Sequence, residues 1–167
     1  GTMLMLSSKN FLEVCNDKWN TYNFFRSFGI DTPKTALMSE IMKQSNIGMD
    51  FPVIIKPRDG MGSRGIEHAN DFNELLDLKL TSNDYIVQEF IEGIEFTVDV
   101  LCDLDGNVIS VVPRQRLEVR DGEVSKSKSS RDFRIINSTL DLINKANSSL
   151  DYKITGPINI QCIINNN

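Results

Sequence analysis

The segment Val53–Gly65, VIIKPRDGMGSRG, carries the clearest chemical potential in this sequence. Lys56 ends a run of apolar and β-branched residues, and Gly60, Gly62 and Gly65 follow it. A strand that ends in lysine can direct a compact cation at an anion. Glycines let backbone N–H groups approach phosphate oxygens without interference from a Cβ atom. The spacing therefore predicts a phosphate-binding loop, with a surface turn and a solvated lysine as the alternative.

Three other glycine-containing phosphate loops fit this segment less well. A Rossmann loop joins its strand directly to a helix, whereas the next helix is expected only near Asn70. A protein kinase has its glycines before the lysine-bearing strand, but Lys56 precedes them here, and no HRD or DFG sequence follows. A Walker A loop requires GK[ST], which is absent. A fragment of a Rossmann dehydrogenase remains a distant alternative.

The elements around this loop are predicted to be mixed helices and antiparallel strands. Asp17 is a suitable N-cap for a helix, and the turns at 105–107 and 121–122 are typical of hairpins. Because repeated βαβ units are missing, the pattern indicates α+β lobes. Helices are expected over Asp17–Phe28, Ser39–Ser45, Asp71–Lys79 and Asp132–Asn147, and strands over Phe51–Lys56, Tyr85–Ile91, Phe96–Cys102, Val108–Pro113 and Gly156–Ile164.

Composition narrows the class of protein. The 167 residues suffice for one domain or for two small lobes that share a cleft. The net charge of −5 argues against a nucleic-acid surface, and no apolar run or signal peptide indicates a membrane protein. The three cysteines, Cys15, Cys102 and Cys162, show no metal-ligand spacing. We expect buried thiols in a cytoplasmic protein without nucleic-acid or membrane partners.

The segment Pro113–Ser130 is the most cationic part of this acidic chain. Strand alternation places Arg114 and Arg116 on one face, which favours a shared anionic target. Arg116 and Lys126 are therefore candidate catalytic residues that meet a terminal phosphate or an anionic substrate. The alternative is a solvated hairpin with scattered charges.

Five motifs in order resemble the ATP-grasp superfamily, and within it the large subunit of carbamoyl phosphate synthase. They are Asp17-Lys18 with the helix leading to GIDTP (29–33), the glycine segment 53–65, VQEFI (87–91), GIEFTVDV (93–100) and GPINIQ (156–161). The resemblance covers almost the whole chain. It implies an α+β ATP-grasp fold in which two α+β lobes hold ATP in the cleft between them. We expect a helical and extended lead-in over 1–50, a lid lobe over 51–92 and a second lobe over 93–167.

The resemblance implies that five residues contact the phosphates of ATP. Lys18 and Lys56 correspond to the two phosphate-side cations of the family, and Lys56 is the one on the strand. Met61, Gly62 and Ser63 would fold over the phosphates. For Lys18, an ordinary exposed helix lysine is the alternative.

The resemblance also implies which residues contact the adenine and ribose of the nucleotide and which residue binds a metal ion. Glu89 and Ile91, with Phe90 between them, resemble the interlobe hinge that reads the adenine edge. Glu95 resembles the carboxylate that accepts the ribose hydroxyls, and a carboxylate offers two acceptors to a diol. Both glutamates could instead be strand-surface residues. Gln161 resembles the first magnesium ligand, although glutamine binds magnesium poorly without acidic partners.

The resemblance implies an ATP-dependent carbon–nitrogen ligase. Such an enzyme uses ATP and Mg²⁺ to activate a carboxylate or bicarbonate as an acyl phosphate, which an amine-type nucleophile then displaces. Family members end this lobe with a strand that carries an E-x-N-P-R motif, and this sequence stops at Asn167 before such a strand. We therefore expect a truncated second lobe, further polypeptide on both sides and little activity from this stretch alone. A non-catalytic ATP-grasp-like module for regulation or protein contact is the alternative.

Overall fold

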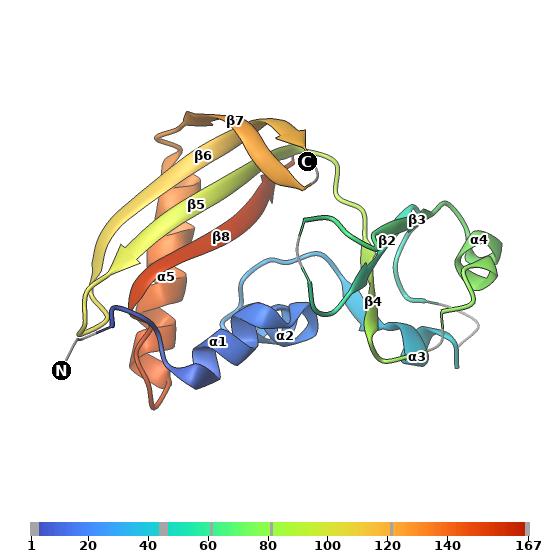
Figure 1. Ribbon diagram of the computed structural model, residues 1–167, viewed down its shortest axis with the longest axis horizontal. Coiled ribbons are helices and arrows are strands. Elements are labelled where there is room, and N and C mark those ends of the chain that lie inside the picture. Colours follow the sequence, from blue (N-terminus) through green and yellow to red (C-terminus); the bar gives the residue numbers. More distant parts are fainter. Residues whose placement is uncertain (1–3, 44–46, 61, 81, 121, 166–167) are drawn as a thin grey trace.

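The computed structural model describes residues 4–43, 47–60, 62–80, 82–120 and 122–165, which fold into two lobes (Figure 1). Each lobe has a four-stranded sheet and its own hydrophobic core. The described strand pairs of both sheets are antiparallel. The prediction of two α+β lobes is confirmed. No helix in the described ranges is long and apolar enough to cross a membrane.

The smaller lobe contains the segment that we expected to be a lid, and we call it the lid lobe; it lies on the right in Figure 1. Its sheet has the order β1-β4-β2-β3. The elements are β1 (Thr35–Leu37), α3 (Met38–Ile41), β2 (Val53–Pro57), β3 (Glu67–Ala69), α4 (Phe72–Asp77) and β4 (Tyr85–Glu89). The strand β1 comes from the predicted lead-in, so part of that segment belongs to the lid sheet.

Side-chain alternation separates the two faces of the lid sheet. Val53, Ile55 and Val87 are fully buried, and they form one cluster with Met38 of α3 and Leu75 of α4. Successive side chains of a strand point to opposite faces. Lys56 therefore lies on the face opposite this core.

The larger lobe contains a second sheet with the order β7-β6-β5-β8. Its elements are α1 (Lys9–Asn16), α2 (Lys18–Ser27), β5 (Ile94–Cys102), β6 (Val108–Arg120), β7 (Glu123–Ser129), α5 (Phe133–Ser149) and β8 (Gly156–Ile164). The buried residues Phe96, Val98, Val100 and Cys102 alternate along β5 as predicted, and they share a core with Ile143 of α5. The intervening residues of β5 form the opposite, more polar face.

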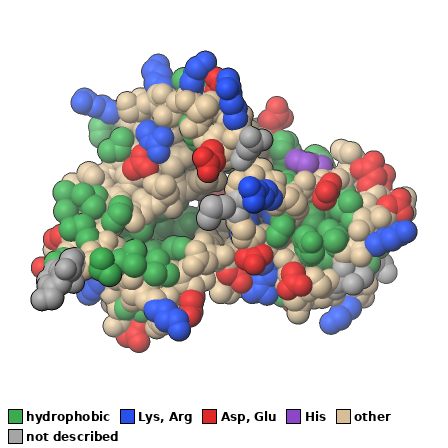
Figure 2. Space-filling model, in the orientation of Figure 1, with side chains coloured by type: hydrophobic (Ala, Val, Ile, Leu, Met, Phe, Trp, Pro, Cys, Tyr) green, Lys and Arg blue, Asp and Glu red, His purple; other side chains and the backbone are tan. Residues whose placement is uncertain are grey.

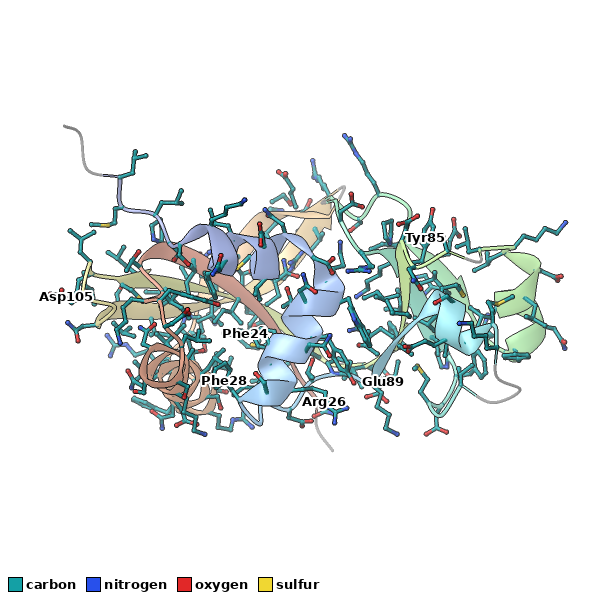
Figure 3. The ribbon with its side chains drawn as sticks, turned by 90° about the horizontal axis from the view of Figure 1, so that it is seen from below. Phe24, Arg26, Phe28, Tyr85, Glu89 and Asp105 are labelled. Atoms are coloured by element: carbon teal, nitrogen blue, oxygen red, sulfur yellow. The ribbon has the colours of Figure 1, made fainter. Side chains whose placement is uncertain are left out.

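The chain passes between the lobes twice. Residues 28–34 lead from α2 to β1, and residues 90–93 lead from β4 to β5. The two connections run side by side, because the Glu89 N–H donates to the Lys34 carbonyl at 3.0 Å. Figure 3 shows Phe24 and Phe28 on α2 and Glu89 at the end of β4, where the chain leaves the lid.

Several local predictions differ from the structure. The helix α1 was not predicted, because its eight residues place only Phe11 in the core. Asp71, rather than Asn70, caps α4 and accepts from two backbone N–H groups. Cys15 is exposed near the end of α1, and so the expectation of a buried thiol was wrong there. Residues 44–46 of the expected short helix lie outside the described residues.

Candidate functional site

Lys56 sits at the end of β2 with its ammonium group partly buried. Burial lowers its pKa, and the nearby ammonium group of Lys18 lowers it further, while the carboxylate of Glu95 opposes both effects. Within the described part of the chain, neither lysine forms an ion pair with a carboxylate. Two amines that repel each other without a paired anion are poised for a negatively charged ligand.

A chain of hydrogen bonds orients Lys56. Its Nζ donates to Gln88 Oε1 at 2.9 Å, and Gln88 Nε2 donates to Thr35 Oγ1 at 2.9 Å. The Thr35 hydroxyl in turn donates to the Pro33 carbonyl at 2.9 Å. Lys56, Gln88 and Thr35 come from three neighbouring strands of one sheet. Sequence reasoning missed Gln88, although its place one residue before Glu89 on β4 was a usable signal.

Lys18 begins α2 and holds the base of the glycine-rich loop. Its Nζ lies 3.0 Å from the Gly60 carbonyl, 3.3 Å from that of Asp59 and 3.5 Å from that of Arg58. Burial lowers the pKa of Lys18, and Asp59 and Asp17 oppose this effect. Lys18 thus lies beside the loop and near Lys56, and its role as a phosphate-side cation stays a prediction.

Arg58 is tied to α2 rather than directed at a ligand. Its guanidinium binds the Asp17 carboxylate, with the Nη2–Oδ2 pair at 2.5 Å. Asp17 also caps α2 by accepting from the N–H groups of Trp19 and Asn20. The ion pair fixes the start of the loop against the larger lobe.

The rest of the loop adopts backbone conformations that suit glycine. Gly60, Gly62 and Gly65 have φ angles of 91°, 69° and 68°. Ser63 also has a positive φ of 54°, which is uncommon for a residue with a side chain. Met61, which was expected to cover the phosphates, lies outside the described residues.

The segment that we expect to act as the hinge, residues 89–91, lies where β4 ends. The Phe90 N–H donates to the Pro52 carbonyl at 3.1 Å, and its ring contacts His68 edge to face. Phe90 is 44% exposed and Ile91 is half-buried. Among the described residues, the Ile91 N–H has no hydrogen-bond partner. This donor is therefore available to a ligand between the lobes.

Glu95 and Arg116 face each other on neighbouring strands of the larger sheet. Arg116 Nε lies 3.3 Å from Glu95 Oε2, and Arg116 Nη2 donates to the Gly122 carbonyl at 3.1 Å. The Arg116 side chain is 8% exposed, whereas that of Glu95 is 56% exposed. Glu95 also acts on Lys56 across the cleft. The structure thus brings Lys18, Lys56, Glu95 and Arg116 into one neighbourhood.

Lys126 is not part of this group. It is 72% exposed and pairs with Glu118 at 2.8 Å. Arg114 is likewise occupied, because it forms a bidentate ion pair with Asp99, and this pair lowers the pKa of Asp99. Arg116 is the cationic candidate on this hairpin that lies at the cleft.

Gln161 lies on the polar face of β8, opposite Thr97 of β5. Magnesium prefers carboxylate and water ligands. Within the described ranges, no three His, Cys, Asp or Glu side chains form a group that could hold a metal ion. The described donors therefore do not fit a magnesium site by themselves, and the role of Gln161 stays a prediction.

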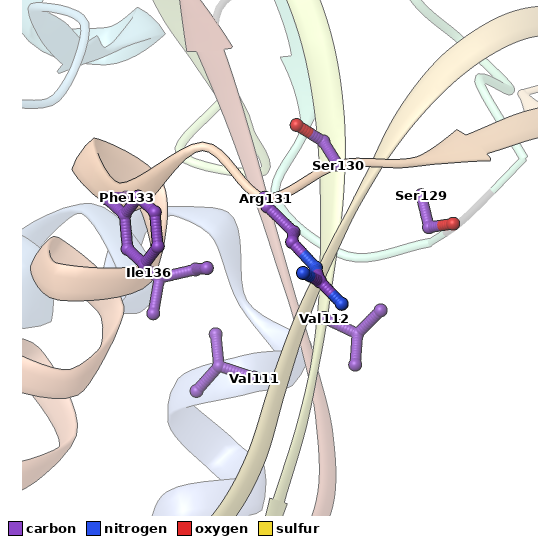
Figure 4. A pocket seen from close by; sticks show the side chains of 7 residues that line it. All are labelled: Val111, Val112, Ser129, Ser130, Arg131, Phe133 and Ile136. Atoms are coloured by element: carbon purple, nitrogen blue, oxygen red, sulfur yellow. The ribbon is translucent and has the colours of Figure 1, made fainter.

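The molecular surface is hollowed where the two lobes meet (Figure 2). A separate open groove of about 530 Å³ lies between β6 and the start of α5 (Figure 4). Its lining residues are Val111, Val112, Ser129, Ser130, Arg131, Phe133 and Ile136. None of these belongs to the group around Lys56, so the interlobe cleft is the candidate site.

The comparisons with known proteins agree with this geometry. The family model for the ATP-grasp domain matches residues 15–166. The chain therefore belongs to the ATP-grasp family.

Two curated relatives illustrate the sequence similarity. The chain is 27% identical over 90 residues to a carbamoyl-phosphate synthase of Methanobrevibacter smithii, covering 54% of this chain and 24% of that protein. It is 34% identical over 108 residues to a D-alanine–D-alanine ligase of Wolbachia pipientis wMel, covering 62% of this chain and 34% of that protein. The chain thus spans about a quarter to a third of these relatives.

Solved structures show the same fold. N5-carboxyaminoimidazole ribonucleotide synthetase in complex with ADP matches 90% of this chain and 41% of its own, with a TM-score of 0.73 and 12% identity. D-alanine–D-alanine ligase from Bacillus anthracis in complex with ATP matches 96% of this chain and 54% of its own, with a TM-score of 0.63 and 20% identity. The predicted ATP-grasp fold is confirmed.

Proposed function

We propose that this chain forms the ATP-binding cleft of an ATP-dependent carboxylate–amine ligase. The observation that supports this most directly is the pair of close, partly buried ammonium groups of Lys18 and Lys56, which lack paired carboxylates in the described part of the chain. A triphosphate supplies the negative charge that such a pair lacks.

The remaining contacts fit a nucleotide that lies along the cleft. In this proposal the Ile91 N–H donates to the adenine edge at the hinge, and Glu95 accepts from the ribose hydroxyls. Lys56 binds the phosphates, and the Gly62–Ser63 backbone covers them. The relatives named as a D-alanine–D-alanine ligase and a carbamoyl-phosphate synthase support a reaction in which a carboxylate attacks the terminal phosphorus of ATP to give ADP and an acyl phosphate. An amine then displaces the phosphate. The described residues leave the carboxylate and the amine unspecified.

ATP binding should weaken as the pH rises through the lowered pKa of Lys56. In the free protein, burial and the ammonium group of Lys18 hold this pKa below the usual value of a lysine, whereas a bound phosphate stabilises the ammonium form. Affinity is therefore full below the lowered pKa and falls between that pKa and the higher pKa of the bound state. The phosphates of ATP are already ionised in this range. Calorimetric titrations from pH 7 to pH 10 measure the effect.

Lys56→Arg serves as the control for this titration, because a guanidinium stays charged up to pH 12. The decline with pH should be smaller in this variant. No binding of ATP at pH 7 would contradict the proposed function. The reaction is tested by measuring phosphate release from the longest available polypeptide with a series of carboxylates and amines. Binding of ATP without phosphate release with any of them would favour the non-catalytic module.

Gln88→Glu should weaken ATP binding about tenfold, which corresponds to about 1.4 kcal/mol. The new carboxylate would lie where the amide oxygen now accepts from Lys56 at 2.9 Å. It would pair with the ammonium group and repel the phosphates. Gln88→Met removes the acceptor without adding charge, so a loss of only two- to threefold is expected. Equal affinities for the two variants would show that charge at position 88 does not matter.

A further inference from the structure

The glycine-rich loop touches the larger lobe at its tip as well as at its base. A Cβ atom added to Gly122, in the turn between β6 and β7, would lie 2.5 Å from the Gly62 carbonyl carbon and 2.5 Å from Ser63 Oγ. It would also lie 2.6 Å from Ser63 N. Such distances are far inside van der Waals contact. The β6–β7 turn and the loop therefore fit together only because residue 122 lacks a side chain.

The side chain of Arg116 is hydrogen-bonded to this turn. Its Nη2 donates to the Gly122 carbonyl at 3.1 Å. Its Nε faces Glu95 Oε2 at 3.3 Å but makes no hydrogen bond of good geometry within the described part of the chain. The Arg116 side chain is only 8% exposed, so the residues packed around it restrict the position of its guanidinium. Arg116 thus links the contact point of the loop to Glu95.

We propose that the β6–β7 turn is a latch for the glycine-rich loop and that Arg116 is the positioning residue that sets it. This inference deepens the proposed function, because it assigns Arg116 to loop closure rather than to direct contact with a phosphate. Glu95 has a second oxygen that can accept from a diol while Oε2 remains beside Arg116. A ribose bound there restrains Glu95, and through Arg116 it restrains the turn against which the loop closes.

Trypsin cleavage after Arg64 in the nucleotide-free protein tests the latch. Arg64 is exposed and lies in the loop next to Ser63. Arg116→Gln removes the bond to Gly122, and Gly122→Asn adds a Cβ that displaces the loop. Each variant should be cleaved after Arg64 at least fivefold faster than the unmodified protein, as followed by mass spectrometry.

Two further variants separate the latch from general effects on stability. Gly29→Asn is the control for Gly122→Asn, because Gly29 also has a positive φ, of 69°, but no atom lies within 4 Å of an added Cβ. Asn tolerates this left-handed backbone. Gly29→Asn should therefore change the cleavage rate less than twofold. Arg116→Lys keeps the charge but loses the planar fork, and it should restore protection only partly. Unchanged cleavage in both Arg116→Gln and Gly122→Asn, with native circular dichroism, would overturn the latch.

Nucleotides test the coupling separately. ATP should slow cleavage after Arg64 more than inorganic tripolyphosphate does at equal occupancy, and Arg116→Gln should abolish this difference. An equal effect of both ligands on the unmodified protein would refute the coupling to ribose. If ATP does not bind at all, the proposed function fails, but the nucleotide-free cleavage rates still decide whether the latch exists.

Discussion

Lys56→Met should weaken ATP binding by roughly 30- to 140-fold while leaving the fold intact. A hydrogen bond from a charged donor contributes about 1.5–3 kcal/mol, and the upper part of this range applies to a partly buried ammonium group that binds a polyanion. Each 1.4 kcal/mol is a factor of about ten in affinity. The single tryptophan, Trp19, follows Lys18 and provides a fluorescence signal for the titration.

The same substitution should not destabilise the protein, which distinguishes a binding role from a structural one. Burial and Lys18 both disfavour the charged form of Lys56, as the direction of its pKa shift indicates. Methionine keeps the apolar stem and removes this cost. The midpoint of urea unfolding is therefore expected to stay constant or to rise.

Lys145→Met is a matched control for Lys56→Met. Lys145 is half-exposed on α5, where it pairs with Asp141 four residues earlier, far from the cleft in sequence and fold. ATP affinity should be unchanged in this control. Adenosine, which lacks phosphates, should bind equally well to the unmodified protein and to Lys56→Met. An ATP affinity of Lys56→Met within about threefold of the unmodified protein would remove Lys56 from the phosphate site.

Asn147→Ala should lower the free energy of unfolding by about 2–6 kcal/mol, since two buried backbone groups would lose their partners at about 1–3 kcal/mol each. Asn147 Nδ2 donates to the Gly106 carbonyl at 2.7 Å, and its Oδ1 accepts from the Ile154 N–H at 2.7 Å. One side chain thus joins the β5–β6 turn, the end of α5 and the segment before β8.

Asn144→Ala provides the comparison for Asn147→Ala, because Asn144 is exposed on the same helix. Its effect should stay within about 0.5 kcal/mol, as for most surface substitutions. Urea denaturation followed by circular dichroism measures both variants. If the two alanine variants unfold at the same urea concentration, the buried amide does not hold these segments together.

Local sequence signals predicted much of the fold. The apolar run of β2, the alternation in β5 and the Asp17 cap each depend on neighbouring residues alone, and all three are confirmed. The extension of β6 to Arg120 was missed, because Pro113 suggests an end to a strand. Pro113 instead lies opposite Val98 within the sheet and is fully buried.

The candidate site was predictable only in part. Lys56 and the glycines follow one another in the chain, so their spacing indicated the loop directly. The bond between Lys56 and Gln88, the ion pair between Arg58 and Asp17, and the contact of Gly122 with the loop join residues that are 32, 41 and about 60 positions apart. Such contacts depend on sheet register and on how the lobes meet, which a single sequence does not encode locally.

The paired connections between the lobes have a consequence for how the proposed nucleotide site would respond to motion. Because the Glu89 N–H and the Lys34 carbonyl are bonded where the chain crosses, a rotation of the lid lobe about these connections would turn around an axis beside them. Ile91 lies within one of the connections, so such a rotation would displace it little. Gly62 and Ser63 lie against Gly122 of the larger lobe, so the same rotation would break that contact. In our proposal, the adenine end of the cleft is therefore less sensitive to lobe motion than the phosphate end.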